Sequence, residues 1–199
     1  MHGVYRGIVV AAVILVVTVG VVACRRGQSN VSARELPEYT PSATIKDLMQ
    51  AIVDPSADDV WLSVTTVMSG TGTVETVPKT DEDWAKVRHG AIKLLEVSNL
   101  LIVPGRHVAR PGEKSDAPGV ELEPSEMEAL ILKDIPGWRA RAKALHEAGL
   151  EALKAADARD APKIFEVGEQ IEEACENCHR SYWYPNEKIP PPLRQPSGQ

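Results

Sequence analysis

The sequence predicts an all-α protein folded as one antiparallel four-helix bundle, and three observations support this class. The chain has 199 residues, 43% of them hydrophobic, which is enough for one sizeable core. Only 5% are aromatic, so aliphatic side chains must fill most of that core, a composition that suits packed helices. Apolar residues recur at three- and four-residue steps along several segments, whereas no segment of any length alternates as a β-strand does. A four-helix bundle is the simplest fold that accounts for this pattern.

The first helix is predicted over residues 42–67. Asp54 and Pro55 interrupt its pattern, but Asp can cap a helix and Pro suits a first helical turn, so we expect one kinked helix that continues to Val67. Gly, Thr and Pro dominate residues 70–80, which predicts a loop. The apolar face of the helix comprises Ile45, Leu48, Met49, Ile52 and Val53.

The second helix is predicted to begin at Thr80 or Asp81 and to stop before the Pro-Gly pair at 104–105. Residues 105–123 are polar, contain several Gly and Pro residues and show no periodicity, so they are predicted to form a surface loop. The apolar stripe of this helix is the clearest in the chain: Trp84, Val87, Ala91, Leu94, Leu95, Ser98, Leu101 and Ile102.

A short helix and the third long helix are predicted next. The short helix covers about residues 124–135, and the Pro-Gly pair at 136–137 is predicted to interrupt the helical pattern. The third long helix then covers residues 138–156, where apolar side chains again recur at helical spacing.

The fourth long helix is predicted to open at Asp160, which can cap it, with Pro162 in its first turn, and to run to Tyr182. Cys175 and Cys178 fall on its predicted buried side. The Pro-rich tail, residues 185–199, follows. These elements place the folded domain at residues 42–184.

The N-terminal residues 1–23 are predicted to be an export signal or a membrane anchor. One early positive charge precedes an unbroken apolar run over residues 8–23. That run is short of the roughly 20 residues that a spanning helix needs. It ends in Val-Val-Ala-Cys, which resembles the lipobox of bacterial lipoproteins with Cys24 as the lipidated residue. Residues 24–41 are polar and are predicted to be a flexible linker.

This N-terminus predicts that the domain faces the periplasmic side of a bacterial membrane, anchored by lipidated Cys24 or by an uncleaved N-terminal helix. The net charge of −6 is spread along the chain without a basic cluster. Such a surface would repel a phosphate backbone, so a nucleic-acid partner is not expected.

The sequence CENCH, residues 175–179, carries the chemistry. Cys175, Cys178 and His179 occupy positions i, i+3 and i+4 and therefore share one face of a helix. A CxxCH motif is the attachment signature of c-type haem, and export favours it because the haem is attached outside the cytoplasm. Zinc would need two more ligands, and a redox dithiol would belong to a βαβ unit. We therefore favour one covalent haem c over zinc and over a dithiol pair.

The motif near the end of a four-helix pattern resembles the class II c-type cytochromes, the cytochrome c prime family, over roughly residues 42–184. The resemblance implies that Cys175 and Cys178 form the thioether bonds and that His179 is the proximal iron ligand. Tyr182 matches a tyrosine frequent in the family. Trp183 stands where the family usually has Arg or Lys, unless Arg180 takes that role.

The resemblance also implies that the first helix faces the other side of the iron. Met49 is our candidate for the second axial ligand; Met68, Met127 and His89 are weaker candidates. Ligation by Met49 implies a monohaem cytochrome for periplasmic one-electron transfer, an electron carrier and not an enzyme. An apolar residue there instead implies a five-coordinate module that binds nitric oxide or carbon monoxide. A third interpretation is an accessory subunit in which the haem is mainly structural.

The expected partners are redox proteins, among them a respiratory complex. The family resemblance also implies that the chain forms a homodimer. The tryptophans Trp61, Trp84 and Trp138 are predicted to pack in the core or at the haem edge. Arg106 and His107 are predicted to lie in an exposed loop, with contact to a haem propionate as the alternative. An acidic outer face is predicted on the fourth helix, where it could orient a basic partner: Glu166, Glu169, Glu172, Glu173 and Glu176.

Overall fold

The computed structural model describes residues 39–187 of the chain. The predicted segment 1–23 and Cys24 lie outside these residues, as do most of the predicted linker and most of the Pro-rich tail. The described part is mostly helical and contains a small two-stranded sheet. Its elements are α2 (Ile45–Leu48), the π-helical turn η1 (Met49–Val53), α3 (Asp54–Trp61), β1 (Thr65–Ser69), β2 (Gly72–Thr76), α4 (Asp81–Leu101), α5 (Pro124–Lys133), α6 (Ile135–Ala158) and α7 (Ala161–Tyr182).

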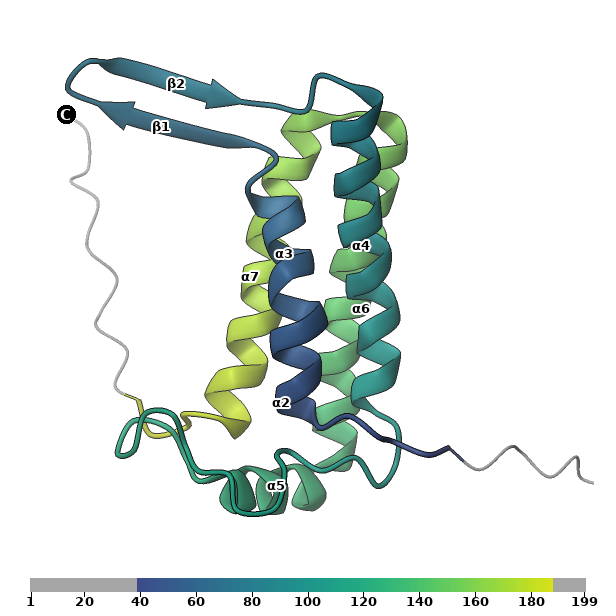
Figure 1. The fold of residues 1–199 in the computed structure, drawn as a ribbon, viewed down its shortest axis with the longest axis vertical. Coiled ribbons are helices and arrows are strands. Elements are labelled where there is room, and N and C mark those ends of the chain that lie inside the picture. The colour runs from purple at the N-terminus through teal and green to yellow at the C-terminus, as the bar shows by residue number, and fades with distance from the viewer. Residues whose placement is uncertain (1–38, 188–199) are drawn as a thin grey trace, which may run out of the picture. The chain divides into compact units, whose positions relative to one another are not determined.

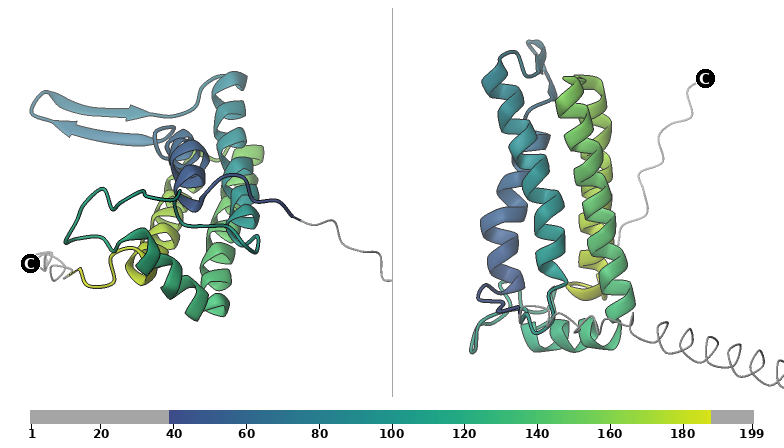
Figure 2. Two further views of the ribbon diagram at one scale, coloured as in Figure 1. Left: turned by 60° about the horizontal axis from the view of Figure 1, so that its bottom comes forward. Right: turned by 90° about the vertical axis from the view of Figure 1, so that its right-hand side faces the viewer.

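The segments α2, η1 and α3 follow one another directly and form one helical column, called here the first column (Figure 1). α4, α6 and α7 lie alongside it, and successive columns run in opposite directions (Figure 2). α4 packs against α3 and α6, and α7 packs against α6 and, to a smaller extent, against α3. The short helix α5 crosses the end at which the first column begins and α7 ends. Within residues 39–187, every helix is too short or too polar to span a lipid bilayer.

Two of the long helices begin where the sequence predicts. At the start of α4, the Thr80 hydroxyl accepts a hydrogen bond from the Asp83 N–H at 3.1 Å, and the Asp83 carboxylate accepts one from the Thr80 N–H at 2.9 Å. This is a capping box, which satisfies two backbone donors at once. At the start of α7, the Asp160 carboxylate accepts from the Lys163 N–H at 3.0 Å, with Pro162 in the first turn. Both predicted starts are confirmed.

The start of α6 differs from the prediction by three residues. Pro136 and Gly137 were expected to interrupt the helix, but they form its first turn. A proline in the first turn of a helix loses no hydrogen bond, since its nitrogen would have no partner there in any case. The Asp134 carboxylate accepts a hydrogen bond from the Gly137 N–H at 3.0 Å and so caps α6 from its first residues.

The predicted kink near Pro55 takes the form of the π-helical turn η1. The Asp54 N–H donates to the Met49 carbonyl, five residues back, where an α-helix would use a residue four back. Pro55 has no N–H and cannot continue the regular ladder. The wider turn therefore comes just before the proline, and Met49 is its first residue.

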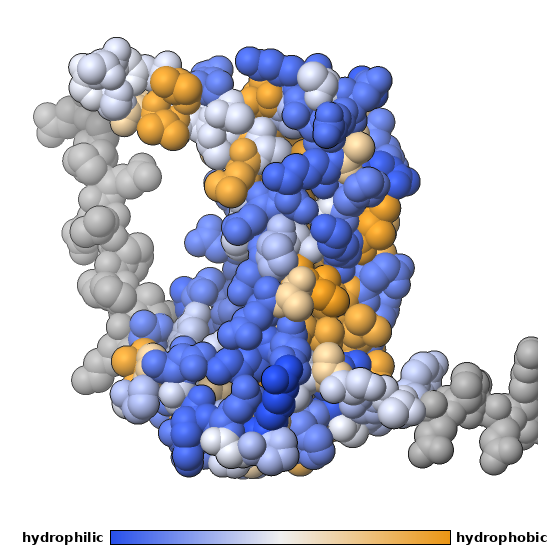
Figure 3. Space-filling model, viewed as in Figure 1, coloured by the Kyte–Doolittle hydropathy of each residue, from blue (hydrophilic) through white to orange (hydrophobic). Residues whose placement is uncertain are grey.

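The prediction of a purely α-helical chain is wrong at residues 62–76. α3 ends at Trp61 instead of continuing to Val67, and the predicted loop contains a strand. β1 and β2 pair antiparallel with Val67 opposite Val74. Both strands are rich in Thr and Val, whose branched side chains favour extended backbone. The hairpin projects from the end opposite α5, and its apolar side chains stay exposed: Val67 is 58%, Val74 63% and Met68 81% exposed (Figures 1 and 3).

The core lies between the four columns and is aliphatic, as predicted, with Val60, Leu94, Ile164 and Ile171 almost fully inaccessible to water. α4 and α6 approach closely at Gly149, where a Cβ atom would lie only 2.9 Å from the backbone nitrogen of Leu95. The close approach needs a residue without a side chain at this position.

We therefore expect Gly149→Ala to lower the free energy of unfolding by about 1–2 kcal/mol, because overpacking against backbone costs about 1–3 kcal/mol and exceeds the roughly 1 kcal/mol that alanine gains in a helix. Urea denaturation measures the difference. The control is Gly70→Ala, since nothing lies within 4 Å of a Cβ at Gly70. A Gly149→Ala variant as stable as the unmodified chain would contradict the close packing of α4 against α6.

Candidate functional site

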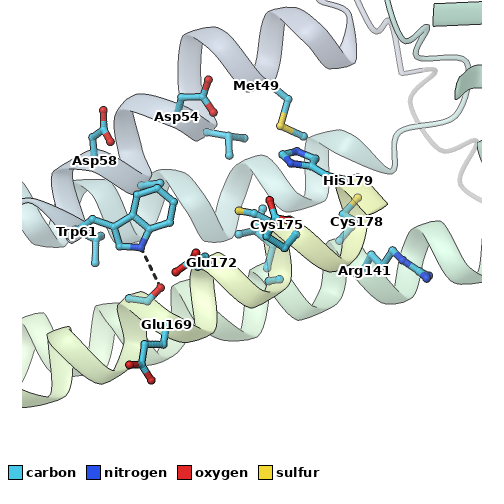
Figure 4. Close-up of a pocket in the computed structure, with 18 of the residues that line it drawn as sticks. Met49, Asp54, Asp58, Trp61, Arg141, Glu169, Glu172, Cys175, Cys178 and His179 are labelled. Carbon is cyan, nitrogen blue, oxygen red and sulfur yellow. Dashed lines mark hydrogen bonds between the residues drawn. The ribbon is translucent and has the colours of Figure 1, made fainter. Parts of the chain in front are cut away.

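A cavity of about 730 Å³ lies between the first column and α7, with α6 as a third wall (Figure 4). This volume falls within the roughly 300–1,000 Å³ of small-molecule and cofactor pockets. At one end, the Trp61 indole N–H donates to the Gly168 carbonyl at 3.0 Å and joins α3 to α7. The apolar part of the lining includes Val53, Ala57, Trp61, Trp138, Leu145 and Ile164.

The four predicted site residues line this one cavity. Cys175, Cys178 and His179 come from α7, and Met49 comes from η1 in the facing column. In Figure 4 the Met49 side chain extends toward the part of the cavity that holds His179. The fold thus places the Met49 thioether on one wall and the His179 imidazole, with the two thiols beside it, on the facing wall. The two segments that carry these groups are more than a hundred residues apart in the sequence.

The helical periodicity of α7 brings the motif to the cavity. The buried stripe of this helix runs through Ile164, Val167, Ile171 and Ala174, and Cys175 and Cys178 are half-buried beside it. Residues three and four apart share a helix face, so His179 follows Cys175 by one turn on the same side.

Burial governs the protonation of the motif. It raises the pKa of Cys175 to about 11, helped by the negative charges of Asp54 and Glu176. It also raises the pKa of Cys178 to about 12, and the guanidinium of Arg141 only partly opposes it. Burial lowers the pKa of His179, because desolvation disfavours the charged imidazolium. At neutral pH the chain therefore presents protonated thiols and a neutral imidazole, the form of histidine that ligates metals.

Aromatic rings surround His179 at the end of α7. Trp183 stands edge-to-face with the imidazole at 5.0 Å between ring centroids, and Tyr184 at 6.0 Å. The Tyr184 hydroxyl donates to the Glu176 carboxylate at 2.7 Å, which ties the residues after the helix back to it. These contacts fix the His179 imidazole against the rings of Trp183 and Tyr184.

A second set of contacts fixes the end of α7 against α6. The Tyr182 hydroxyl donates to the Asp134 carboxylate at 3.0 Å, and burial raises the pKa of Tyr182 to about 12. The Tyr182 ring also packs edge-to-face with Trp138 at 5.5 Å. Arg141 lies over the same ring and donates to the Ser181 hydroxyl at 2.9 Å. The tyrosine singled out in the sequence is therefore an anchor for the motif helix.

Carboxylates form much of the polar lining of the cavity, which sequence reasoning missed. Five carboxylates and one guanidinium, that of Arg141, line it: Asp54 and Asp58 from α3, and Glu169, Glu172 and Glu176 from α7 (Figure 4). The three glutamates were predicted to lie on a solvated outer face, and Glu169 and Glu172 are exposed as predicted, but the sequence did not show that this face borders the cavity. Their spacing of three and four residues from each other and from Cys175 and His179 was the available signal. Burial raises the pKa of Asp54.

The weaker ligand candidates lie elsewhere. Met68 is 81% exposed on the hairpin, and His89 is exposed on α4. Met127 is buried on α5, outside the larger cavity, but it lines a smaller neighbouring cavity together with Cys178 and His179. Of the three, only Met127 therefore lies near the motif, and none of them lines the larger cavity.

The predicted cations also find other partners. Arg106 donates to the carbonyls of Leu100 and Ala43, and His107 pairs with Glu128 at 2.9 Å, so neither lines the cavity. Arg180 pairs with Glu176 at 3.1 Å. Among the predicted tryptophans, Trp61 and Trp138 line the cavity, whereas Trp84 is buried on α4 away from it.

A second, smaller cavity of about 60 Å³ adjoins the first around His179. Four residues line both cavities: Met49, Trp138, Cys178 and His179. The loop 105–123, predicted only as surface, covers this side and is held in place by backbone hydrogen bonds. The Ile45 N–H donates to the His107 carbonyl at 2.9 Å, and the Leu122 N–H to the Trp183 carbonyl at 2.9 Å.

The residues at the larger cavity fit a covalently attached haem. Two thiols one helical turn apart can each form a thioether, and one neutral imidazole beside them can ligate the iron. The apolar walls suit a porphyrin, and Met49 offers a soft sulfur ligand. Zinc would need further protein ligands, and within residues 39–187 no three His, Cys, Asp or Glu side chains gather as a metal site.

No protein-family model, curated protein or solved structure matches this chain.

The raised thiol pKa values predict slow alkylation in the haem-free chain. At pH 8 we expect Cys175 and Cys178 to react with iodoacetamide at least tenfold more slowly in the folded chain than in denaturant, since only the thiolate attacks. Peptide mass mapping separates the two cysteines from Cys24. Equal rates in the folded and denatured chain would contradict the burial of these thiols.

Proposed function

We propose that this protein is a monohaem c-type cytochrome that transfers one electron at a time. One observation carries the proposal: Cys175, Cys178, His179 and Met49 line a single cavity of about 730 Å³ between two facing helical columns. The CxxCH motif alone would also be compatible with a redox dithiol or with part of a zinc site. A methionine on the facing wall of an apolar cavity of cofactor size instead fits a haem whose iron would take a second ligand from the protein.

The roles of the residues follow from their positions. Cys175 and Cys178 would hold the haem through thioether bonds, and His179 and Met49 would ligate its iron. The bound haem would supply the reversible one-electron couple. The chain would exclude water from it with the side chains of Trp138, Leu145 and their apolar neighbours, and would keep the imidazole oriented through its aromatic contacts.

The proposal includes the finer fold description, an antiparallel four-helix bundle similar to class II c-type cytochromes. The alternating directions of the four columns support it, as does the position of the cavity between the first column and α7. The hairpin β1–β2 and the short helix α5 are additional to the four columns.

The proposal extends to the location and partners. Residues 1–23 would direct the domain to the periplasmic side of a bacterial membrane and Cys24 would carry the lipid, unless the N-terminal helix stays as the anchor. The partners would be redox proteins, among them a respiratory complex, and the chain would act as a carrier and not as an enzyme. A homodimer follows from the family resemblance alone.

The spectrum of the haem-loaded chain tests the axial ligands. We expect a low-spin, six-coordinate spectrum with a methionine-to-iron charge-transfer band, and we expect Met49→Ala to abolish the band and yield a high-spin spectrum. The control is Met68→Ala. Because Met68 is exposed on the hairpin, this substitution should leave the spectrum unchanged.

The same measurement separates the competing functions. A high-spin spectrum in the unmodified chain, with rapid binding of carbon monoxide, would contradict electron transfer through a Met49-ligated haem and would identify the gas-binding alternative. A chain that acquires no covalent haem when it is produced with the c-type attachment machinery would contradict both.

A further inference from the structure

The indole N–H of Trp183 is buried and has no hydrogen-bond acceptor among residues 39–187. A buried donor without a partner costs free energy comparable to a lost hydrogen bond, so native structures leave few such groups unexplained. Trp61 provides the contrast, since its indole N–H is satisfied by the Gly168 carbonyl at 3.0 Å. The Trp183 donor therefore suggests an acceptor that residues 39–187 do not provide.

Trp183 stands where such an acceptor could belong to a bound haem. It lines the smaller cavity together with His179 and Cys178, and its ring lies 5.0 Å from the imidazole. About 60 Å³ is far too small for a porphyrin, but it exceeds the roughly 10–15 Å³ that one water molecule needs. A side group of a haem held in the larger cavity could extend into this space, because the two cavities meet at His179.

The charges of the lining residues favour binding of the haem propionates at the smaller cavity over the larger cavity. The larger cavity is lined by five carboxylates and one guanidinium, so it would repel a propionate. The smaller cavity is lined by Lys46 and Lys114 as well as by Asp116 and Glu121, so its charges balance. The Lys46 ammonium pairs with Asp116 at 2.8 Å, and its side chain is only 22% exposed.

We infer that the Trp183 indole N–H donates a hydrogen bond to a propionate carboxylate of the haem held at Cys175 and Cys178, with Lys46 as the neighbouring cation. This inference rests on the proposed function. It assigns a carboxylate-binding role to the residue that stands where a basic side chain was expected, and it sets the direction of the haem: its carboxylates face the loop 105–123 and not the carboxylate-lined opening between α3 and α7.

Resonance Raman spectroscopy of the haem-loaded full chain tests this hydrogen bond directly, because the propionate bending bands respond to hydrogen bonding. We expect Trp183→Phe to shift a propionate bending band. The matched control is Trp84→Phe, which removes an indole buried on α4 that lines neither cavity and should leave the propionate bands in place. Identical propionate bands in the unmodified chain and in Trp183→Phe would overturn the inference.

A binding measurement separates a hydrogen bond from mere packing. A full chain carrying Cys175→Ala and Cys178→Ala could bind haem only without covalent bonds, so its affinity for haem can be compared with its affinity for haem dimethyl ester, in which both propionates are esterified. We expect Trp183→Phe to weaken haem binding by about tenfold or more, as for a hydrogen bond to a charged group, and to change ester binding by no more than about twofold. Equal losses for both ligands would show that Trp183 only packs.

The two proposals can fail separately. If the unmodified chain acquires no covalent haem and the chain carrying Cys175→Ala and Cys178→Ala binds none, the proposed function fails and this inference fails with it. If the haem is attached and shows the expected spectrum, but Trp183→Phe changes neither the Raman bands nor the relative affinities, the inference alone is wrong.

Discussion

The hydrogen bond between the Trp61 indole and the Gly168 carbonyl is the interaction on which the candidate site depends. Elsewhere the columns pack tightly: α4 approaches α6 so closely at Gly149 that a methyl group would strike backbone. α3 and α7 touch far less, and the cavity occupies the space between them. Among the described residues, this bond is the one side-chain hydrogen bond that joins the two helices. It closes one end of the cavity while the other end stays wide enough for Met49 and the motif to face each other.

The distribution of charge at the site follows from the separation of α3 and α7. Because α3 and α7 are separated at the cavity, the sides of both helices that face it are open to solvent. These sides carry carboxylates, so the opening of the cavity between α3 and α7 is acidic. The thiols and the imidazole lie deeper, where burial keeps them neutral. Neutral groups cost less to bury than ions, which allows this chain to keep three reactive side chains beside an apolar cavity without a compensating charge. The end of α7 is held by uncharged aromatic contacts and by the bond from Tyr182 to Asp134.

Local signals in the sequence predict the helix starts and the motif, while longer-range features escape them. Thr80 and Asp160 cap helices through residues three positions away, so their roles can be read directly. The hairpin was missed because Thr65–Ser69 and Gly72–Thr76 are short, exposed on both faces and lack a buried alternation. The acidic face of α7 is exposed as predicted, but the sequence did not show that part of it borders the cavity, because periodicity cannot tell an outer face from the rim of a cavity. The position of Trp183 beside the loop 105–123, where its carbonyl accepts from the Leu122 N–H, depends on a contact that is not local.

The π-helical turn at Met49–Val53 has a consequence for how such a site can change over evolution. A π turn is equivalent to one residue inserted into an α-helix. The wider turn absorbs that extra residue, so losing one residue from positions 50–53 would restore the regular helix and leave Met49 on nearly the same face. A deletion inside the regular helix α3 would instead rotate everything before it by about 100° around the axis, since an α-helix has about 3.6 residues per turn, and Met49 would leave the cavity wall without being substituted. The residue that faces His179 is thus set by the length of α3 as much as by its own identity, whereas the π turn can lose one residue without changing it.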